Sequence, residues 1–267
     1  MTKQKNILMS ILILLLITIS CHFEQSGDSE NGDVLPEEIS FYTEDSIKIY
    51  GDLYKLNSTM PLIIMFHQGG SNAKGEYTPI IPRLIEMGYN VLATDQRVGG
   101  QWYGGYNRTL AEISNNGYGD GYGYCDAYNN LEGALHFAIN LGFTDKLILW
   151  GSSYSASLAI KLADKNQQAV DGVLAFSPAS GRSMTDCLPD EHFSSLSIPL
   201  LMLRPPNEME SENSIKQFEL ASSHGHKTFV PEFGVHGSSM LVKERVGNDV
   251  EATREVVLNF LNEIKDS

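Results

Sequence analysis

The chain has 267 residues, of which 42% are hydrophobic, and its formal net charge is −14. This composition excludes collagen, coiled coils, polytopic membrane proteins and disulfide-rich miniproteins, and a chain of this length can bury a full hydrophobic core. The acidic balance also makes nucleic acids and anionic lipid surfaces poor binding partners, because both require clustered Lys and Arg.

The first 20 residues are expected to be an export signal that is removed from the mature protein. They carry Lys3 and Lys5, no acidic residue, and an apolar run over residues 7–19. A membrane-spanning helix needs about 20 apolar residues, whereas a shorter run is typical of the central region of a signal peptide. We therefore assign residues 1–20 to a signal peptide. Without it, 17 Lys and Arg against 33 Asp and Glu leave a formal charge of −16.

The predicted signal ends directly before Cys21. The stretch Thr18-Ile19-Ser20-Cys21 resembles the lipobox of bacterial lipoproteins, although Thr18 stands where Leu is usual. The polar and acidic composition of residues 21–38 predicts a flexible tether. The resemblance implies a lipoprotein that contacts the membrane only through its lipidated N-terminal Cys21, in the periplasm or at the cell surface of a bacterium. An ordinary cleaved signal followed by an incidental cysteine is the alternative.

Residues 39–56 predict two β-strands, because Ile47, Ile49 and Leu53 alternate onto one face. Six short apolar runs then predict buried strands at 61–66, 90–94, 146–150, 170–176, 198–203 and 228–230. Between or after them, helical spacing is seen at 80–85, 131–141, 158–162, 215–221 and 250–264. Apolar strands that alternate with amphipathic helices indicate a mostly parallel central sheet with helices on both faces. We expect residues 39–267 to form one α/β domain.

Residues 96–125 interrupt this alternation. They contain eight glycines, six aromatic residues and little periodicity, which predicts a long loop of a kind that is often functional. The loop begins at the carboxyl end of a predicted strand, where open α/β sheets bind ligands. It is equally compatible with a substrate pocket or lid and with a self-packed surface loop.

Two cysteines, Cys125 and Cys187, remain in the mature chain. In an oxidising compartment they could pair, and the sequence leaves a disulfide and two unpaired thiols equally open. Neither cysteine belongs to a CxxC motif or a His/Cys cluster, so no metal site is expected.

The sharpest chemical signal is the stretch Gly151-Ser152-Ser153-Tyr154-Ser155. An apolar strand ends just before it and a helix is expected over 153–165, which places Ser153 on a tight strand-to-helix turn. Such a turn requires a strained backbone and small residues two positions to either side. It exposes the hydroxyl and directs the first amides of the helix at a developing oxyanion. Ser153 is therefore the candidate nucleophile, and Ser152 is its alternative.

A nucleophilic serine needs a base, and the base needs an orienting acid. Glu208 follows the predicted strand 198–203, and His236 lies in the loop after the strand 228–230. Both residues come just past the carboxyl ends of their strands, as Ser153 does, so the three side chains can converge. Glu210 is the second choice for the acid.

With these motifs, residues 40–265 resemble the α/β-hydrolase fold superfamily, especially its dienelactone-hydrolase-like and esterase-like members. The order of the candidates along the chain matches the family, and the resemblance implies that Ser153 is the nucleophile, Glu208 the acid and His236 the base. It also implies that the substrate is a small molecule with an acyl group, and that neither a metal nor an organic cofactor is needed.

The family also places an oxyanion hole after an early strand, at a His-Gly motif. The stretch His67-Gln68-Gly69-Gly70 resembles it, with Gln68 where the first Gly usually lies. The resemblance implies that an amide of Gln68 or Gly69 acts together with that of Tyr154, and that His67 braces the loop.

The resemblance implies a serine hydrolase that cleaves an ester or related acyl bond through an acyl-enzyme intermediate. A peptidase on the same fold and a non-catalytic, ligand-binding surface lipoprotein are the alternatives. Because the fold serves many chemistries, the sequence does not identify the substrate.

Overall fold

The computed structural model describes residues 34–116 and 121–267. The predicted signal peptide, Cys21 and most of the predicted tether lie outside this range. Within it, no helix is both long enough and apolar enough to span a membrane.

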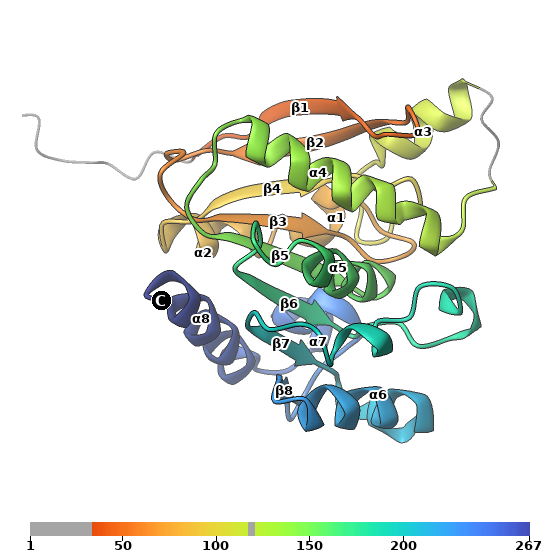
Figure 1. Cartoon of the computed structure of the whole chain (residues 1–267), viewed down its shortest axis with the longest axis vertical. Coiled ribbons are helices and arrows are strands. Elements are labelled where there is room, and N and C mark those ends of the chain that lie inside the picture. The colour runs from red at the N-terminus through yellow and green to blue at the C-terminus, as the bar shows by residue number, and fades with distance from the viewer. Residues whose placement is uncertain (1–33, 117–120) are drawn as a thin grey trace, which may run out of the picture. The chain divides into compact units, whose positions relative to one another are not determined.

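An eight-stranded sheet forms the centre of the domain, with strand order β1-β2-β4-β3-β5-β6-β7-β8 (Figure 1). Strand β2 pairs antiparallel with β1 and β4, and the remaining neighbours pair in parallel. The predicted mostly parallel sheet is confirmed, and each of the six apolar runs forms a strand whose ends lie within two residues of the predicted ones. The strands are Glu37–Tyr42 (β1), Lys48–Tyr54 (β2), Leu62–Phe66 (β3), Asn90–Thr94 (β4), Leu147–Ser152 (β5), Gly172–Phe176 (β6), Leu200–Leu203 (β7) and Lys227–Phe229 (β8).

The burial of each strand follows its place in the sheet. Every residue of β3, β4, β5, β6 and β7 is buried, because helices cover both faces of the sheet there. The edge strand β1 buries only alternate residues, Ile39 and Phe41. This difference is the physical origin of the two sequence patterns, continuous apolar runs and simple alternation.

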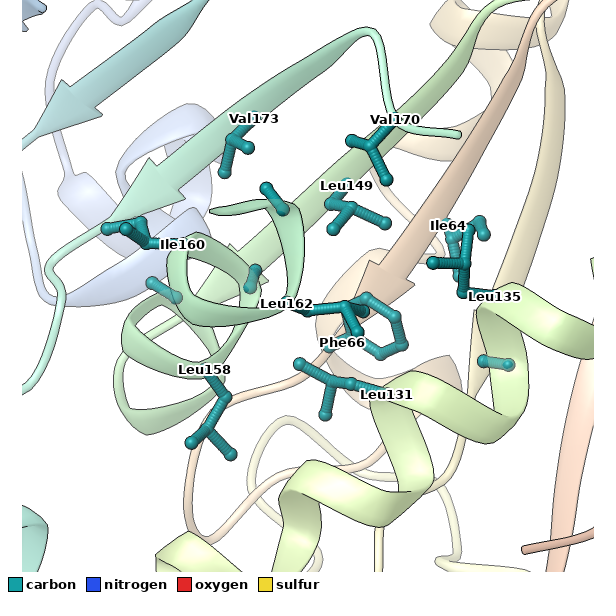
Figure 2. Close-up of a cluster of buried hydrophobic side chains, with 14 of the residues drawn as sticks. Ile64, Phe66, Leu131, Leu135, Leu149, Leu158, Ile160, Leu162, Val170 and Val173 are labelled. Carbon is teal, nitrogen blue, oxygen red and sulfur yellow. The ribbon is translucent and has the colours of Figure 1, made fainter. Parts of the chain in front are cut away.

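Helices pack on both faces of the sheet. Helices α4 and α5 contribute Leu131, Leu135, Leu158 and Leu162 to a core over one face, where Figure 2 shows them around Phe66 of β3. Helices α1, α2 and α8 contribute to the core over the other face. The α-helices are Ala73–Tyr77 (α1), Ile81–Glu86 (α2), Arg108–Asn115 (α3), Tyr128–Asn140 (α4), Tyr154–Lys165 (α5), Glu212–Ser223 (α6), Lys243–Val246 (α7) and Glu251–Lys265 (α8).

Short 3-10 helices occupy several of the loops: Tyr124–Ala127 (η1), Arg182–Met184 (η2), Asp190–His192 (η3), Pro206–Glu210 (η4) and Gly237–Leu241 (η5). Two of them, η4 and η5, follow strands β7 and β8 and carry or flank candidate site residues.

The prediction of a continuous loop over 96–125 is wrong in one part, because α3 lies within it. The side chain of Asn107 caps this helix by accepting a hydrogen bond from the Leu110 amide at 2.8 Å. Thr109 accepts one from the amide of Tyr50 on β2 at 3.0 Å. With only Thr109 and Ile113 buried, two turns offer too few apolar positions for a recognisable helical period. Residues 117–120 of the segment lie outside the described residues.

Candidate active site

Ser153 lies between β5 and α5 with φ 62° and ψ −123°, a conformation that non-glycine residues rarely adopt. The backbone strain that the motif predicts is therefore present. The Ser153 amide donates to the carbonyl of Phe176 at 2.8 Å, which fixes the turn to the end of β6. A Cβ at Gly151 would lie 2.5 Å from the Cα of Ala156, so this position accepts only glycine.

The structure separates Ser153 from the alternative nucleophile Ser152. The Ser152 side chain is fully buried, and its Oγ accepts a hydrogen bond from the Ser238 amide at 2.9 Å. Ser153 is partly exposed at the carboxyl edge of the sheet. Of the two hydroxyls, only that of Ser153 is accessible to a substrate from solvent.

Glu208 and His236 are brought into contact. The His236 Nδ1 lies 2.6 Å from the Glu208 Oε1. Because an ionised carboxylate only accepts hydrogen bonds, Nδ1 carries the proton and Nε2 is left as an acceptor. The His236 side chain is 48% exposed. Glu210, the second choice for the acid, is exposed and makes no such contact with His236.

Arg204, which belongs to none of the predicted motifs, lies behind Glu208. Its Nη1 donates to the Glu208 Oε2 at 2.8 Å, and its Nη2 donates at 2.5 Å to both the carbonyl of Pro178 and the Oε1 of Gln217. Burial raises the pKa of Glu208, but the hydrogen bond to His236 and the charges of His236 and Arg204 outweigh it, so the pKa lies below its usual value. Glu208 is therefore ionised at neutral pH.

Hydrogen bonds of its neighbours anchor the loop that carries His236. The Gly237 amide donates to the Oγ of Ser177 at 3.0 Å, and the Oγ of Ser238 accepts from the Trp150 indole at 2.8 Å. Together with the bond from Ser238 to Ser152, these contacts hold the loop against the ends of β5 and β6. Within the described residues, no hydrogen bond joins His236 to Ser153 itself.

The two candidates for the early oxyanion amide are distinguished by their partners. The Gln68 amide donates to the Oε2 of Glu76 at 2.8 Å, inside the protein, which argues against Gln68 as an oxyanion donor. Among the described residues, the amide of Gly69 makes no hydrogen bond, and neither does that of Tyr154, the first residue of α5. These two amides are the ones available to a substrate oxygen.

His67 links the oxyanion loop to the segment after β4. Its ring is fully buried, with Nδ1 at 2.9 Å from the carbonyl of Gln68 and Nε2 accepting from the Gln96 amide at 2.8 Å. Burial lowers the pKa of His67, so the ring is neutral and both nitrogens are occupied. This geometry agrees with a bracing residue.

Two aromatic side chains from the 96–125 segment flank the oxyanion loop. The Trp102 amide donates to the Gly70 carbonyl at 2.9 Å, and a Cβ at Gly70 would lie 2.9 Å from the indole. A Cβ at Gly69 would lie 2.8 Å from the Tyr124 hydroxyl, and the Tyr124 ring stacks on Tyr154 with centroids 4.7 Å apart. The sequence left open whether this segment is a substrate pocket or lid, or a self-packed surface loop. Its contacts with the oxyanion loop favour the first interpretation, with the segment lining one side of the candidate site.

The structure joins Cys125 and Cys187 in a disulfide, which decides between the two states that the sequence left open. Cys125 directly follows Tyr124 in η1, and Cys187 lies in the segment after η2, so the disulfide links these two segments. It therefore holds together two loops at the same edge of the sheet as Ser153.

Within residues 34–116 and 121–267, no group of three or more His, Cys, Asp or Glu side chains could hold a metal ion. The Glu208–His236 pair and the Ser153 hydroxyl are the candidate groups that the structure brings to this edge of the sheet.

No protein-family model matches the sequence, and no curated protein matches it. Solved structures do match. An esterase of Pyrococcus furiosus is 16% identical with a TM-score of 0.64, over 86% of this chain and 91% of that one. A carboxyl esterase of Bacillus coagulans is 13% identical with a TM-score of 0.65, over 86% and 99%. A dienelactone hydrolase of Anabaena variabilis is 16% identical with a TM-score of 0.58, over 86% and 98%. The chain therefore has the α/β-hydrolase fold.

Proposed function

We propose that this protein is a serine hydrolase that cleaves an ester or related acyl bond, with Ser153, His236 and Glu208 as its triad. The observation that carries the proposal is the 2.6 Å contact between His236 and Glu208, which leaves Nε2 free to act as a base. The accessible Ser153 hydroxyl on a strained strand-to-helix turn supports the proposal. Two of the similar solved structures are esterases, which supports it as well.

In the proposed reaction, the Nε2 of His236 takes the proton of Ser153 as its Oγ attacks the acyl carbonyl. Glu208 stabilises the imidazolium that forms. The amides of Gly69 and Tyr154 donate to the oxyanion, and the loss of one such donor typically costs about 3–4 kcal/mol of activation free energy. His236 then protonates the leaving group. Water next attacks the acyl enzyme as His236 takes its proton, and His236 returns that proton to the Ser153 oxygen as the acid product leaves. The hydrogen bond between nucleophile and base often tightens only when substrate binds.

Active-site labelling with a fluorophosphonate tests this proposal. The chain starting after Cys21 should react, and its Ser153→Ala and His236→Ala variants should not. Ser152→Ala removes the alternative nucleophile, and it should still be labelled at Ser153. A well-folded parent that is not labelled would favour the binding-protein alternative. A panel of short and long acyl esters beside aminoacyl amides then separates an esterase from a peptidase.

We also propose that the protein is exported and anchored through a lipidated Cys21. The lipobox-like stretch before Cys21 supports this location. The disulfide between Cys125 and Cys187 supports export independently, since disulfides persist mainly in oxidising compartments.

A further inference from the structure

A buried carboxyl group lies behind the oxyanion loop and has no part in the proposed triad. Glu76 belongs to α1, and its side chain is fully buried. Its Oε2 accepts the Gln68 amide at 2.8 Å, whereas its Oε1 has no hydrogen-bond partner among the described residues. A carboxyl group that is buried with one oxygen unpaired lowers the free energy of unfolding. Stability therefore does not explain why a glutamate occupies this position.

The surroundings of Glu76 connect three loops of the candidate site. The Ser152 hydroxyl lies close enough to lower the pKa of Glu76. The backbone of Gly237 packs closely against the same hydroxyl and against the Gln68 side chain. A Cβ added at Gly237 would lie 2.4 Å from the Ser152 Oγ and 3.3 Å from the Gln68 Oε1. The cluster of Gln68, Glu76, Ser152 and Gly237 is thus where the oxyanion loop, the nucleophile turn and the histidine loop meet.

We propose that Glu76 is a positioning residue for acyl hydrolysis, one that holds the Gln68 amide and so leaves the Gly69 amide to face the reacting carbonyl. This inference rests on the proposed function. The amides of Gln68 and Gly69 belong to adjacent rigid peptide planes that are joined only by the φ and ψ angles of Gln68. Glu76 holds the first plane through the Gln68 amide, and the contact of His67 with the Gln68 carbonyl holds the second, which contains the Gly69 amide. Fixing both planes fixes the direction of the Gly69 amide, and oxyanion donors act only when they are aimed in advance.

The charges around Glu76 give this role a pH dependence. Burial raises the pKa of Glu76 to about 7, while the charges of Arg245 and His236 act in the opposite direction. Arg245 itself donates to the backbone carbonyls of Gly75 and Glu76, not to the carboxylate. The nearby phenols of Tyr77 and Tyr154 stay neutral, because burial raises the pKa of each.

An ionised carboxylate accepts a hydrogen bond about twice as strongly as a neutral group, so the hold on Gln68 weakens as the pH falls through about 7. His236 must also be neutral to act as a base. A general base by itself gives an acid limb with a slope of one. The loss of the ionised form of Glu76 adds to it, so we expect log(kcat/KM) of the parent to fall with a slope steeper than one just below pH 7.

Two substitutions test the proposal on the chain starting after Cys21. Glu76→Gln keeps an acceptor for the Gln68 amide but holds it as weakly as protonated Glu76 does, so its kcat at pH 8 should lie about tenfold below that of the parent. Because this variant cannot titrate at position 76, its acid limb should have a slope of one. Glu76→Leu has similar volume and no acceptor. It should lower kcat about a hundredfold, with KM within about threefold, since misplaced reacting groups cost about that factor.

The control is Glu86→Gln, the same substitution at an exposed residue of α2, which should leave both the slope and kcat unchanged. A folded Glu76→Leu with the kcat of the parent overturns the inference, and so does a parent whose acid limb already has a slope of one. If Glu76→Leu does not fold, the slope of Glu76→Gln decides. A parent that neither hydrolyses esters nor labels at Ser153 overturns the proposed function and this inference with it, whereas labelling at Ser153 beside an unaffected Glu76→Leu overturns this inference alone.

Discussion

The side chain of Arg204 is 2% exposed, and its guanidinium pairs with the carboxylate of Glu208. Replacing Arg204 by Met would leave that carboxylate partly buried without its partner. Breaking a buried ion pair in this way typically costs about 3–5 kcal/mol, so we expect the free energy of unfolding at pH 7 to fall by about that amount. Urea unfolding of the parent and Arg204→Met measures it.

The pH dependence of this loss identifies its cause. Because the pKa of Glu208 is lowered in the fold, its contribution to stability is present above the ordinary pKa and is lost as the pH falls through the lowered one. The difference between parent and Arg204→Met should therefore shrink at acid pH, and an equal loss at pH 7 and at low pH would contradict an ion-pair origin. The control Arg83→Met removes an exposed pair with Glu86 and should change stability by less than about 1 kcal/mol.

Glu76 has the opposite linkage between pH and stability. Burial raises its pKa from 4.5 to about 7, so its contribution to stability is fully present below about pH 4.5 and is lost as the pH rises through about 7. At about 1.4 kcal/mol per pKa unit, the loss is about 3 kcal/mol. Glu76→Gln has no charge to bury, and its free energy of unfolding relative to the parent should rise by that amount between pH 4 and pH 8. Parallel pH profiles of parent and variant would contradict the buried charge.

The two residues that carry these predictions were not predictable from the sequence. Ser153, Glu208 and His236 could be proposed because each follows a recognisable strand. Arg204 and Glu76 are charged residues of a kind that is usually exposed, and only the fold shows that they are buried. The Gln217 that receives Arg204 lies 13 residues further along the chain, in a helix with no chemical motif.

At the scale of elements, glycines allow the 96–125 segment to lie directly on the oxyanion loop. The Gly100 amide donates to the Ser71 carbonyl at 2.7 Å, and a Cβ at Gly100 would lie 2.5 Å from the Gly70 carbonyl oxygen. Gly100→Ala should therefore push the two loops apart. We expect kcat to fall about a hundredfold, as a displacement of about 1 Å in a catalytic loop typically costs.

The matched control for this clash is Gly181→Ala, because a Cβ at Gly181 would meet no atom within 4 Å. It should retain the kcat of the parent. Ester hydrolysis by the three proteins, with folding checked by circular dichroism, decides the matter. If Gly100→Ala hydrolyses esters as fast as the parent, the segment does not support the oxyanion loop.

Helix α3 shows where pattern recognition stops at this scale. The long helices repeat an apolar period and the buried strands are continuous apolar runs, so their positions were predicted closely. Helix α3 depends on its Asn107 cap and on the bond from Tyr50 to Thr109. Both are tertiary or capping contacts of single polar side chains, which a hydrophobic period does not record.

At the scale of the molecule, the parallel strands explain why the distant candidate residues could be proposed together. Strands β5, β6, β7 and β8 pair in parallel, so the segments after them share one edge of the sheet. This rule brings Ser153, Glu208 and His236 to the same edge, although up to 83 positions separate them in the sequence. The shared edge does not set the direction of any side chain. The catalytic roles of Ser153, Glu208 and His236 are therefore predictions, which active-site labelling tests.

The location of the molecule is the last prediction. A lipidated Cys21 should carry the full chain into the detergent phase of a Triton X-114 extract, because two or more acyl chains bind a bilayer stably whereas one alone binds weakly. Cys21→Ala should move to the aqueous phase, and so should a control chain that begins at His22 behind an unrelated export signal. A full chain found in the aqueous phase would indicate an ordinary cleaved signal. Retention of Cys21→Ala in detergent would indicate an uncleaved anchor, because the apolar run over residues 7–19 would then still be attached.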